Sequence, residues 1–251
     1  MATLDEIVSY LDLELGTGRI QDYPAALNGL QLANGGRVDR VVAAVDASLS
    51  VIEAAAQGGP GLLVVHHGMF WQGAQPITGA TYRKLKTAMD AGLAIYSSHL
   101  PLDLHHEWGN NSQLAHAIGL LNSKPFCEQK GQAMGLCGDW EGTLEQLLDR
   151  LERVLGSRPH CCAAGPTEIS SLGIITGGAG AEVARVAACG IQTFITGEGP
   201  HWSYTLAEEL GVNLIYGGHY LTETFGVKAL ASMLSNQFEL PWCFIDMPTG
   251  L

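Results

Sequence analysis

Residues 95–103 read IYSSHLPLD, and residues 215–223 read IYGGHYLTE. Each stretch has a short apolar run, two small residues, a histidine and an acid four positions after that histidine. The two pairs are His99 with Asp103 and His219 with Glu223. Two distant segments of the same design indicate an internal duplication. We therefore expect two related halves that bring these ends to one place.

The repeat extends upstream of the two histidine motifs. Both halves follow the order strand, short helix, strand, and then helix, glycine, strand. The first half places its first three elements at 40–48, 50–59 and 62–68, and the second places them at 171–180, 181–190 and 193–199. The remaining helix and strand fall within 82–99 and 202–219.

This order of elements predicts an α/β fold. Strands that alternate with helices form parallel or mixed sheets with helices on both faces, which gives three layers, α/β/α. We treat residues 1–251 as a single unit, with repeat half one at about 1–125 and repeat half two at about 126–251. The stretch from about 105 to 170 matches neither repeat, and we interpret it as the connection, with part of one half's sheet.

A third cluster, LLVVHHGMFW at 62–71, places two adjacent histidines directly after a strand-like run. Turns at strand ends are where α/β folds place their chemistry. A lone histidine beside an apolar run is usually a capping or hydrogen-bonding residue, so the prediction depends on the whole set. Three histidines and two carboxylates suit two divalent metal ions. The candidate metal ligands are His66, His67, Asp103, His219 and Glu223.

Two further residues are candidates for catalytic roles. His99 mirrors His219, yet five ligands suffice without it, so it could be a sixth ligand, an orienting residue or a proton shuttle. The repeat places Glu198 opposite His67, and Glu198 could be a ligand, a general base or a helix N-cap partner.

Four further residues near these clusters are weaker candidates for a functional role. His105 and His106 follow Asp103 closely, and we interpret them as surface loop residues. Trp71 and His201 lie near the clusters and could line a pocket that stacks on an aromatic ligand.

Composition limits the classes of function. The chain has 13 Lys and Arg against 25 Asp and Glu, a formal charge of −12, and its cations form no run. This argues against non-specific binding to nucleic acid or to an anionic membrane. No apolar run is long enough to cross a bilayer, and the N-terminus reads as an amphipathic helix rather than a signal peptide. Six cysteines without a C-x-x-C pair suggest reduced thiols in a cytoplasmic protein.

These motifs together resemble the GTP cyclohydrolase 1 type 2 family, also called Nif-three-like proteins. The resemblance runs nearly end to end, and it is carried by NGLQ at 28–31, VVHHGMFW at 64–71, SSHLPLD at 97–103, TGEG at 196–199 and GGHYLTE at 217–223. It implies a dinuclear metal centre with the five ligands named above, and the family also keeps a His and a Glu at positions 99 and 198. It further implies two interlaced α/β halves related by a pseudo-dyad, assembly into a ring-shaped homohexamer, and the short form without an inserted domain.

The same resemblance implies a metal-dependent hydrolase that opens the guanine imidazole ring of GTP, or acts on a related nucleotide, through metal-activated water. Few cations are available for a triphosphate; the candidates are Arg83, Lys84, Lys86, Arg185 and Lys228. The alternative is a non-catalytic metal-binding scaffold, chaperone or interaction protein. A hydrolase of damaged nucleotides or small amides is a further possibility. The mixed nitrogen and oxygen ligands suit Zn, Fe, Mn or Ni.

Overall fold

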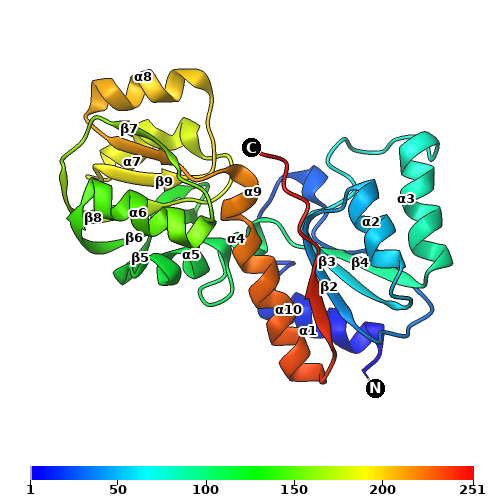
Figure 1. Ribbon diagram of the computed structural model, residues 1–251. Helices are drawn as coiled ribbons and strands as arrows, with labels where there is room; N and C mark the ends of the chain where they lie inside the picture. Colours follow the sequence, from blue (N-terminus) through cyan, green and yellow to red (C-terminus); the bar gives the residue numbers. More distant parts are fainter. Residues whose placement is uncertain (1) are drawn as a thin grey trace. The chain divides into compact units, whose positions relative to one another are not determined.

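The computed structural model describes residues 2–251, which form two compact units. The first unit contains the chain up to Trp108 together with Gly226–Met247, and the second contains Gly109–Phe225 and Pro248–Leu251. Each unit has one sheet with helices on both faces (Figure 1). The predicted α/β fold with mixed sheets is confirmed.

The sheet of the first unit has the strand order β1-β4-β3-β2-β11. Its strands are β1 (Gly29–Leu32), β2 (Val41–Asp46), β3 (Gly61–His67), β4 (Leu93–Ser97) and β11 (Trp242–Phe244). All neighbours are parallel except β1, which runs antiparallel to β4. Val65 of β3 pairs with Ser97 of β4. The carboxyl ends of β3 and β4 therefore meet at one edge, and the histidines that follow them share that edge.

Helices cover both faces of this sheet (Figure 1). They are α1 (Leu4–Leu15), α2 (Leu49–Ala56), α3 (Gly79–Asp90) and α10 (Thr224–Phe238), with the one-turn helix α4 (Leu100–Asp103) and the 3₁₀ turn Pro24–Ala26 at the sheet edge. Successive strand residues point to opposite faces. Accordingly, Val41 and Ala43 pack with α1 and α10, whereas Val42 and Ala44 pack with α2.

The first helix has the amphipathic pattern that the sequence predicts. Thr3 and Glu6 form a capping box at its start, which satisfies two backbone N–H groups and contributes about 1 kcal/mol to helix stability. Its buried residues recur at helical spacing: Leu4, Ile7, Leu11 and Leu15. None of the helices formed by residues 2–251 has the length and apolarity that crossing a membrane requires.

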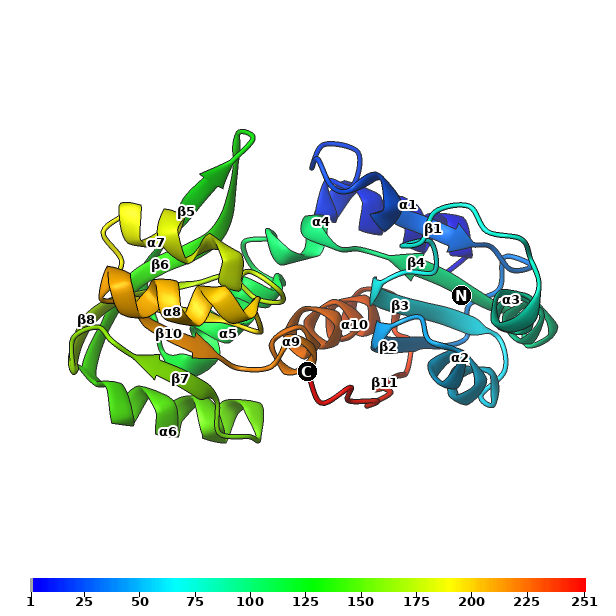
Figure 2. The ribbon, with the colours of Figure 1, turned by 90° about the horizontal axis from the view of Figure 1, so that it is seen from above.

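The sheet of the second unit has the order β5-β6-β8-β9-β10-β7. Its strands are β5 (Leu121–Gln129), β6 (Gln132–Thr143), β7 (His160–Ala163), β8 (Glu168–Ile174), β9 (Thr193–Thr196) and β10 (Asn213–Tyr216). The duplicated strands β8, β9 and β10 are parallel, and the other pairs are antiparallel. Figure 2 shows β5 and β6 as a long hairpin. The sequence interpretation of 105–170 therefore holds in part, because this stretch supplies β5, β6 and β7.

The helices of the second unit are α5 (Asn110–Ile118), α6 (Leu144–Leu155), α7 (Val183–Ala188), α8 (His201–Leu210) and α9 (His219–Thr222), with a 3₁₀ turn at Gly180–Glu182. Helices α5 and α6 pack on one face of the sheet, and α7 and α8 pack on the other (Figure 2). Neighbouring residues Phe194 and Ile195 of β9 point to these opposite faces.

The bounds of the units differ from the predicted division near residue 125. The helix after the first motif, α5, belongs to the second unit, and nearly all of α10, which follows the second motif, belongs to the first. Apolar packing explains this exchange. Val227, Leu230 and Leu234 of α10 join the buried cluster around α1, and Leu114 of α5 packs in the cluster around α6. The two halves of the sequence are therefore interlaced.

Candidate metal centre

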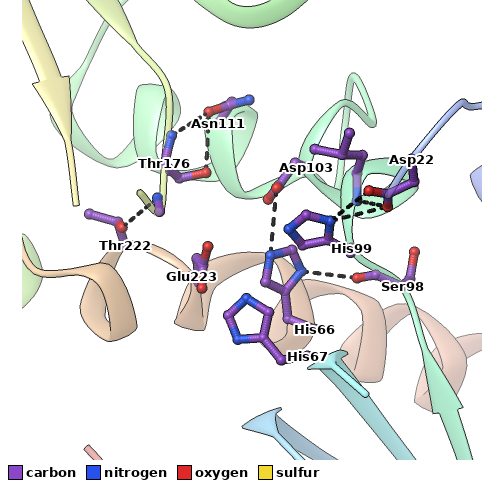
Figure 3. Close-up of polar contacts among 12 residues, drawn as sticks. Asp22, His66, His67, Ser98, His99, Asp103, Asn111, Thr176, Thr222 and Glu223 are labelled. Atoms are coloured by element: carbon purple, nitrogen blue, oxygen red, sulfur yellow. Dashed lines mark hydrogen bonds and ion pairs between the residues drawn. The ribbon is translucent and has the colours of Figure 1, made fainter. Parts of the chain in front are cut away.

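The two adjacent histidines stand at the end of β3 in the first unit. His66 is fully buried, while His67 is partly exposed. His66 Nδ1 donates a hydrogen bond to the backbone carbonyl of Ser98 at 2.9 Å (Figure 3). His67 Nδ1 donates to Asp46 Oδ1, also at 2.9 Å. Both Nδ1 atoms carry the ring proton in these contacts, so each Nε2 is a lone-pair donor for a metal ion.

His99 lies at the N-cap of α4, directly beyond the end of β4. Its Nδ1 donates to Asp22, at 2.9 Å to Oδ1 and 3.1 Å to Oδ2 (Figure 3). One ligand nitrogen from each of His66, His67 and His99 lies within 4.8 Å of the other two. The edge of the first sheet therefore gathers three imidazoles, as the strand order requires.

Asp103 ends α4 and is buried. Its Oδ2 lies 3.5 Å from His66 Nε2. The short helix explains the His-x-x-x-acid spacing, because residues four apart lie on the same helical face. In the first unit the structure therefore brings together His66, His67, His99 and Asp103.

The second unit holds the other predicted residues at the ends of β9 and β10. His219 Nδ1 donates to Glu198 Oε1 at 2.9 Å, and His219 Nε2 lies 3.1 Å from Glu223 Oε2. Burial lowers the pKa of His219, but the contacts with Glu223 and Glu198 outweigh it and raise the pKa to about 9. A metal ion that binds Nε2 would displace this proton. Glu198 does not cap α8, because Pro200 occupies that N-cap position.

The glycine-rich turn after β8 packs against this histidine and acid pair. Gly177 accepts backbone hydrogen bonds from Gly197 and Glu198 and donates to Thr222 Oγ1 at 3.1 Å. A Cβ atom at Gly177 would overlap Glu223 Oε1 and would lie 3.5 Å from His219 Nε2. The glycine is therefore needed for the close approach of the Glu223 carboxylate.

Substitution of Gly177 by alanine is expected to weaken metal binding by about 10–100-fold, because the new methyl group displaces Glu223. The matched control is Gly190→Ala. Gly190 has a similar positive φ, 79° against 70°, but a Cβ there meets nothing within 4 Å. Both variants lose stability from backbone strain, and only Gly177→Ala should lose affinity in a metal titration. Equal affinities in the two variants would contradict this account of the turn.

The structure corrects one prediction about the neighbouring histidines. His105 is not an exposed loop residue: it is buried, and its ring stacks on Trp108 at 4.5 Å between centroids and an angle of 7°. Its Nδ1 accepts hydrogen bonds from the backbone N–H groups of Glu107 and Trp108. Burial lowers the pKa of His105. This residue stabilises the loop after α4.

Trp71 contacts the histidines of the first unit. Its ring meets His99 edge to face at 4.8 Å and His67 at 5.8 Å between centroids. Tyr23, which is 62% exposed, lies 6.4 Å from the Trp71 ring. His201 is exposed and begins α8. An aromatic surface therefore borders His67 and His99.

Sequence reasoning missed the acceptors that orient the imidazoles. Asp22 and Asp46 have no motif of their own, and only the folded chain places them beside His99 and His67. The NGLQ stretch at 28–31, in contrast, is one of the motifs that carry the family resemblance. Asn28 bonds both Asp22 and the His99 backbone, and Gln31 accepts from the Met69 backbone N–H at 2.7 Å.

The donor set fits a divalent cation. The imidazoles of His66, His67 and His99 all have Nδ1 hydrogen-bonded to oxygen, which is the arrangement found in metal-ligating histidines. Their ligand nitrogens are close enough that small side-chain movements would give the ~2.0–2.1 Å bonds of an imidazole site. Clusters of His, Asp and Glu that could bind a metal ion are therefore present.

Comparisons with known proteins show the family of this chain. The Duf34/NIF3 (NGG1p interacting factor 3) family profile matches residues 2–250. A curated protein named GTP cyclohydrolase 1 type 2 homolog, from Deinococcus radiodurans, is 39% identical over 249 residues, which cover 98% of this chain and 94% of the relative. A crystal structure from Thermus thermophilus is similar with a TM-score of 0.88 at 40% identity, covering 99% of this chain and 100% of that one. The solved protein ybgI, of unknown function, has a TM-score of 0.92 at 32% identity, with coverage of 99% and 100%. The chain therefore belongs to the Duf34/NIF3 family.

Proposed function

We propose that this protein binds two divalent metal ions through His66, His67, Asp103, His219 and Glu223. We further propose that it is a metal-dependent hydrolase of the GTP cyclohydrolase 1 type 2 kind. The observation that carries the proposal is shared by four histidines, His66, His67, His99 and His219. Each has its Nδ1 hydrogen-bonded to an oxygen: the Ser98 carbonyl, Asp46, Asp22 or Glu198. Such bonds fix the tautomer in which Nε2 has the lone pair, which would bind a metal ion in His66, His67 and His219 and a proton in His99.

Bound divalent ions would lower the pKa of water toward neutrality and polarise an oxygen of the substrate. Side chains of the protein would then accept and donate the protons of the reaction. His99 stands outside the five-ligand set, and its Nε2 accepts a proton and returns it to the leaving group. Glu198 acts through His219, whose ring it orients.

The substrate class proposed is GTP or a related nucleotide. The names of the relatives support it, since they are GTP cyclohydrolase 1 type 2 homologs at 32–39% identity. The aromatic surface of Trp71 and Tyr23 beside His67 and His99 suits a planar base. Among the few cations, Lys84 is partly buried and interacts electrostatically with Asp46. Because Asp46 is the acceptor of His67, Lys84 lies near that histidine. By resemblance, we propose that the protein works in the cytoplasm as a homohexameric ring.

The second candidate is a non-catalytic metal-binding scaffold, chaperone or interaction protein. Its support is the charge of −12, since 13 Lys and Arg offer little for a triphosphate. The name of the family, NGG1p interacting factor 3, also agrees with this class.

One experiment separates the two functions. Protein purified without chelator, with its metal content measured, is incubated with GTP and a panel of other nucleotides and small amides. The hydrolase proposal predicts release of formate or ring-opened product from GTP or a related nucleotide, and loss of this release after metal is removed. No turnover of any compound by fully metal-loaded protein would favour the scaffold.

A further inference from the structure

The Asp22 carboxylate is enclosed, and hydrogen bonds fix its orientation toward His99. Its side chain is only 5% exposed. Oδ1 accepts from the Tyr23 backbone N–H at 2.7 Å, and Oδ2 accepts from Asn28 Nδ2 at 2.8 Å and from the Leu100 backbone N–H at 2.9 Å. Both oxygens also face His99 Nδ1. The Asp22 carboxylate is thus held in one orientation by three donors besides the imidazole.

Asn28 forms hydrogen bonds with both Asp22 and His99. Its Nδ2 donates to Asp22, while its Oδ1 accepts from the backbone N–H of His99 at 2.8 Å. The same side chain therefore fixes the carboxylate and the backbone of the histidine that the carboxylate contacts. Burial alone would raise the pKa of Asp22, but the hydrogen bonds and the charge of His99 outweigh it and lower the pKa. Asp22 is therefore ionised at neutral pH and can only accept hydrogen bonds.

An ionised carboxylate at Nδ1 decides which ring nitrogen of His99 carries the proton. Nδ1 must be protonated to donate to Asp22, so in the neutral ring Nε2 is a bare acceptor. The rings of His66 and His67 lie 4.9 Å and 5.7 Å from that of His99, between centroids. The unprotonated Nε2 therefore belongs to an imidazole, that of His99, which lies beside two proposed metal ligands.

We infer that Asp22, held by Asn28, is the positioning residue that keeps His99 with its proton on Nδ1 and with Nε2 free to accept a proton at the metal site. A purely structural contact would not require a charged, enclosed acceptor. His66 is oriented by a neutral carbonyl, and the acceptor of His67 is a carboxylate that is 35% exposed. Of the three acceptors in this unit, Asp22 is the carboxylate that is both enclosed and fixed by several donors.

The consequence of this role for turnover rests on the proposed function, but the tautomer of His99 does not. The test therefore uses metal-free protein and nuclear magnetic resonance. Protein labelled with ¹⁵N at histidine is examined at alkaline pH, where neutral imidazoles predominate. The His99 signals are identified by their loss in His99→Gln. Wild type should show a protonated Nδ1 and an unprotonated Nε2 at His99.

The variant Asp22→Asn removes the charge and keeps the shape. The new amide oxygen satisfies the donors at the Oδ2 position, which leaves the amide NH₂ facing His99 Nδ1. The ring proton should then move to Nε2. The matched variant is Asp46→Asn, which removes the charge of the acceptor of the neighbouring His67 and should leave the tautomer of His99 as in wild type.

Three results would overturn the inference. They are a protonated Nε2 at His99 in the wild type, an unchanged His99 tautomer in folded Asp22→Asn, and a changed His99 tautomer in Asp46→Asn. The first needs no variant, so the inference can fail even if Asp22→Asn does not fold. If a substrate is found, Asp22→Asn should lower kcat by about 10–100-fold with metal content retained. A failure of the nucleotide screen would leave the tautomer result in place, so the two hypotheses fail separately.

Discussion

A chain in which His66 and Glu223 are both replaced by alanine should bind almost no divalent metal, whereas the wild type should bind close to two ions. The double variant removes a buried imidazole whose Nδ1 is already fixed by Ser98, and a buried carboxylate whose position depends on the absence of a side chain at Gly177. Each proposed ion loses a ligand, and a carboxylate such as Glu223 is able to bridge two ions, so its loss affects both. The measurement is elemental analysis after purification without chelator.

The control for this variant replaces the same residue types at exposed positions, His116→Ala with Glu209→Ala. The control has the same change in charge and should keep its metal content. If the His66 and Glu223 double variant retained both ions, the proposed ligand set would be wrong.

Replacement of His99 by alanine should leave both ions bound and lower turnover by roughly 10²–10⁴-fold, the usual contribution of a general acid or base. The physical reason is that Asp22 fixes the ring and Asn28 fixes the backbone of His99, whereas the ring is not needed to complete the five-ligand set. The measurement pairs kcat on the nucleotide found in the screen with the metal content of the same sample.

Loss of an ion together with activity would contradict the proton-transfer role and would make His99 a ligand. Unchanged kcat with both ions bound would remove His99 from the reaction altogether. The His116→Ala variant, whose side chain lies exposed on α5, serves as the reference for a histidine loss that has no effect.

Much of the fold follows from local sequence pattern. Glycines after the helical stretches and the repeated strand–helix order predicted β2 to β4 and β8 to β10, and all six strands are present. These signals are local, because a strand's alternation and a helix's spacing depend on neighbouring residues. The motif ends were also predictable, since parallel strands place their carboxyl ends at one edge.

The partner of each helix was not predictable. The apolar residues of α10 and of α5 specify that a face is buried, but not in which unit. The compact units therefore divide after Trp108, whereas the predicted repeat halves of the sequence divide near residue 125.

The acceptors of the site show the same limit. Asp22 precedes His99 by 77 positions in the chain, and no spacing rule connects an aspartate in a loop with a histidine at that separation. The interpretation of His105 was wrong for a similar reason. Its burial comes from Trp108, which stacks on it once the loop is folded.

The central claim is that ligands from both repeats hold the same pair of ions. Anomalous X-ray diffraction from crystals of protein purified without chelator tests it most directly, because it locates each ion and its ligands. The account predicts two ions per chain, each about 2–2.6 Å from its ligand atoms. It predicts that the ligands include His66, His67 and Asp103 from one repeat and His219 and Glu223 from the other. Ions bound by one repeat alone, with His219 on the order of 15 Å or more from His67 when bonds to an ion span only about 2 Å, would contradict it.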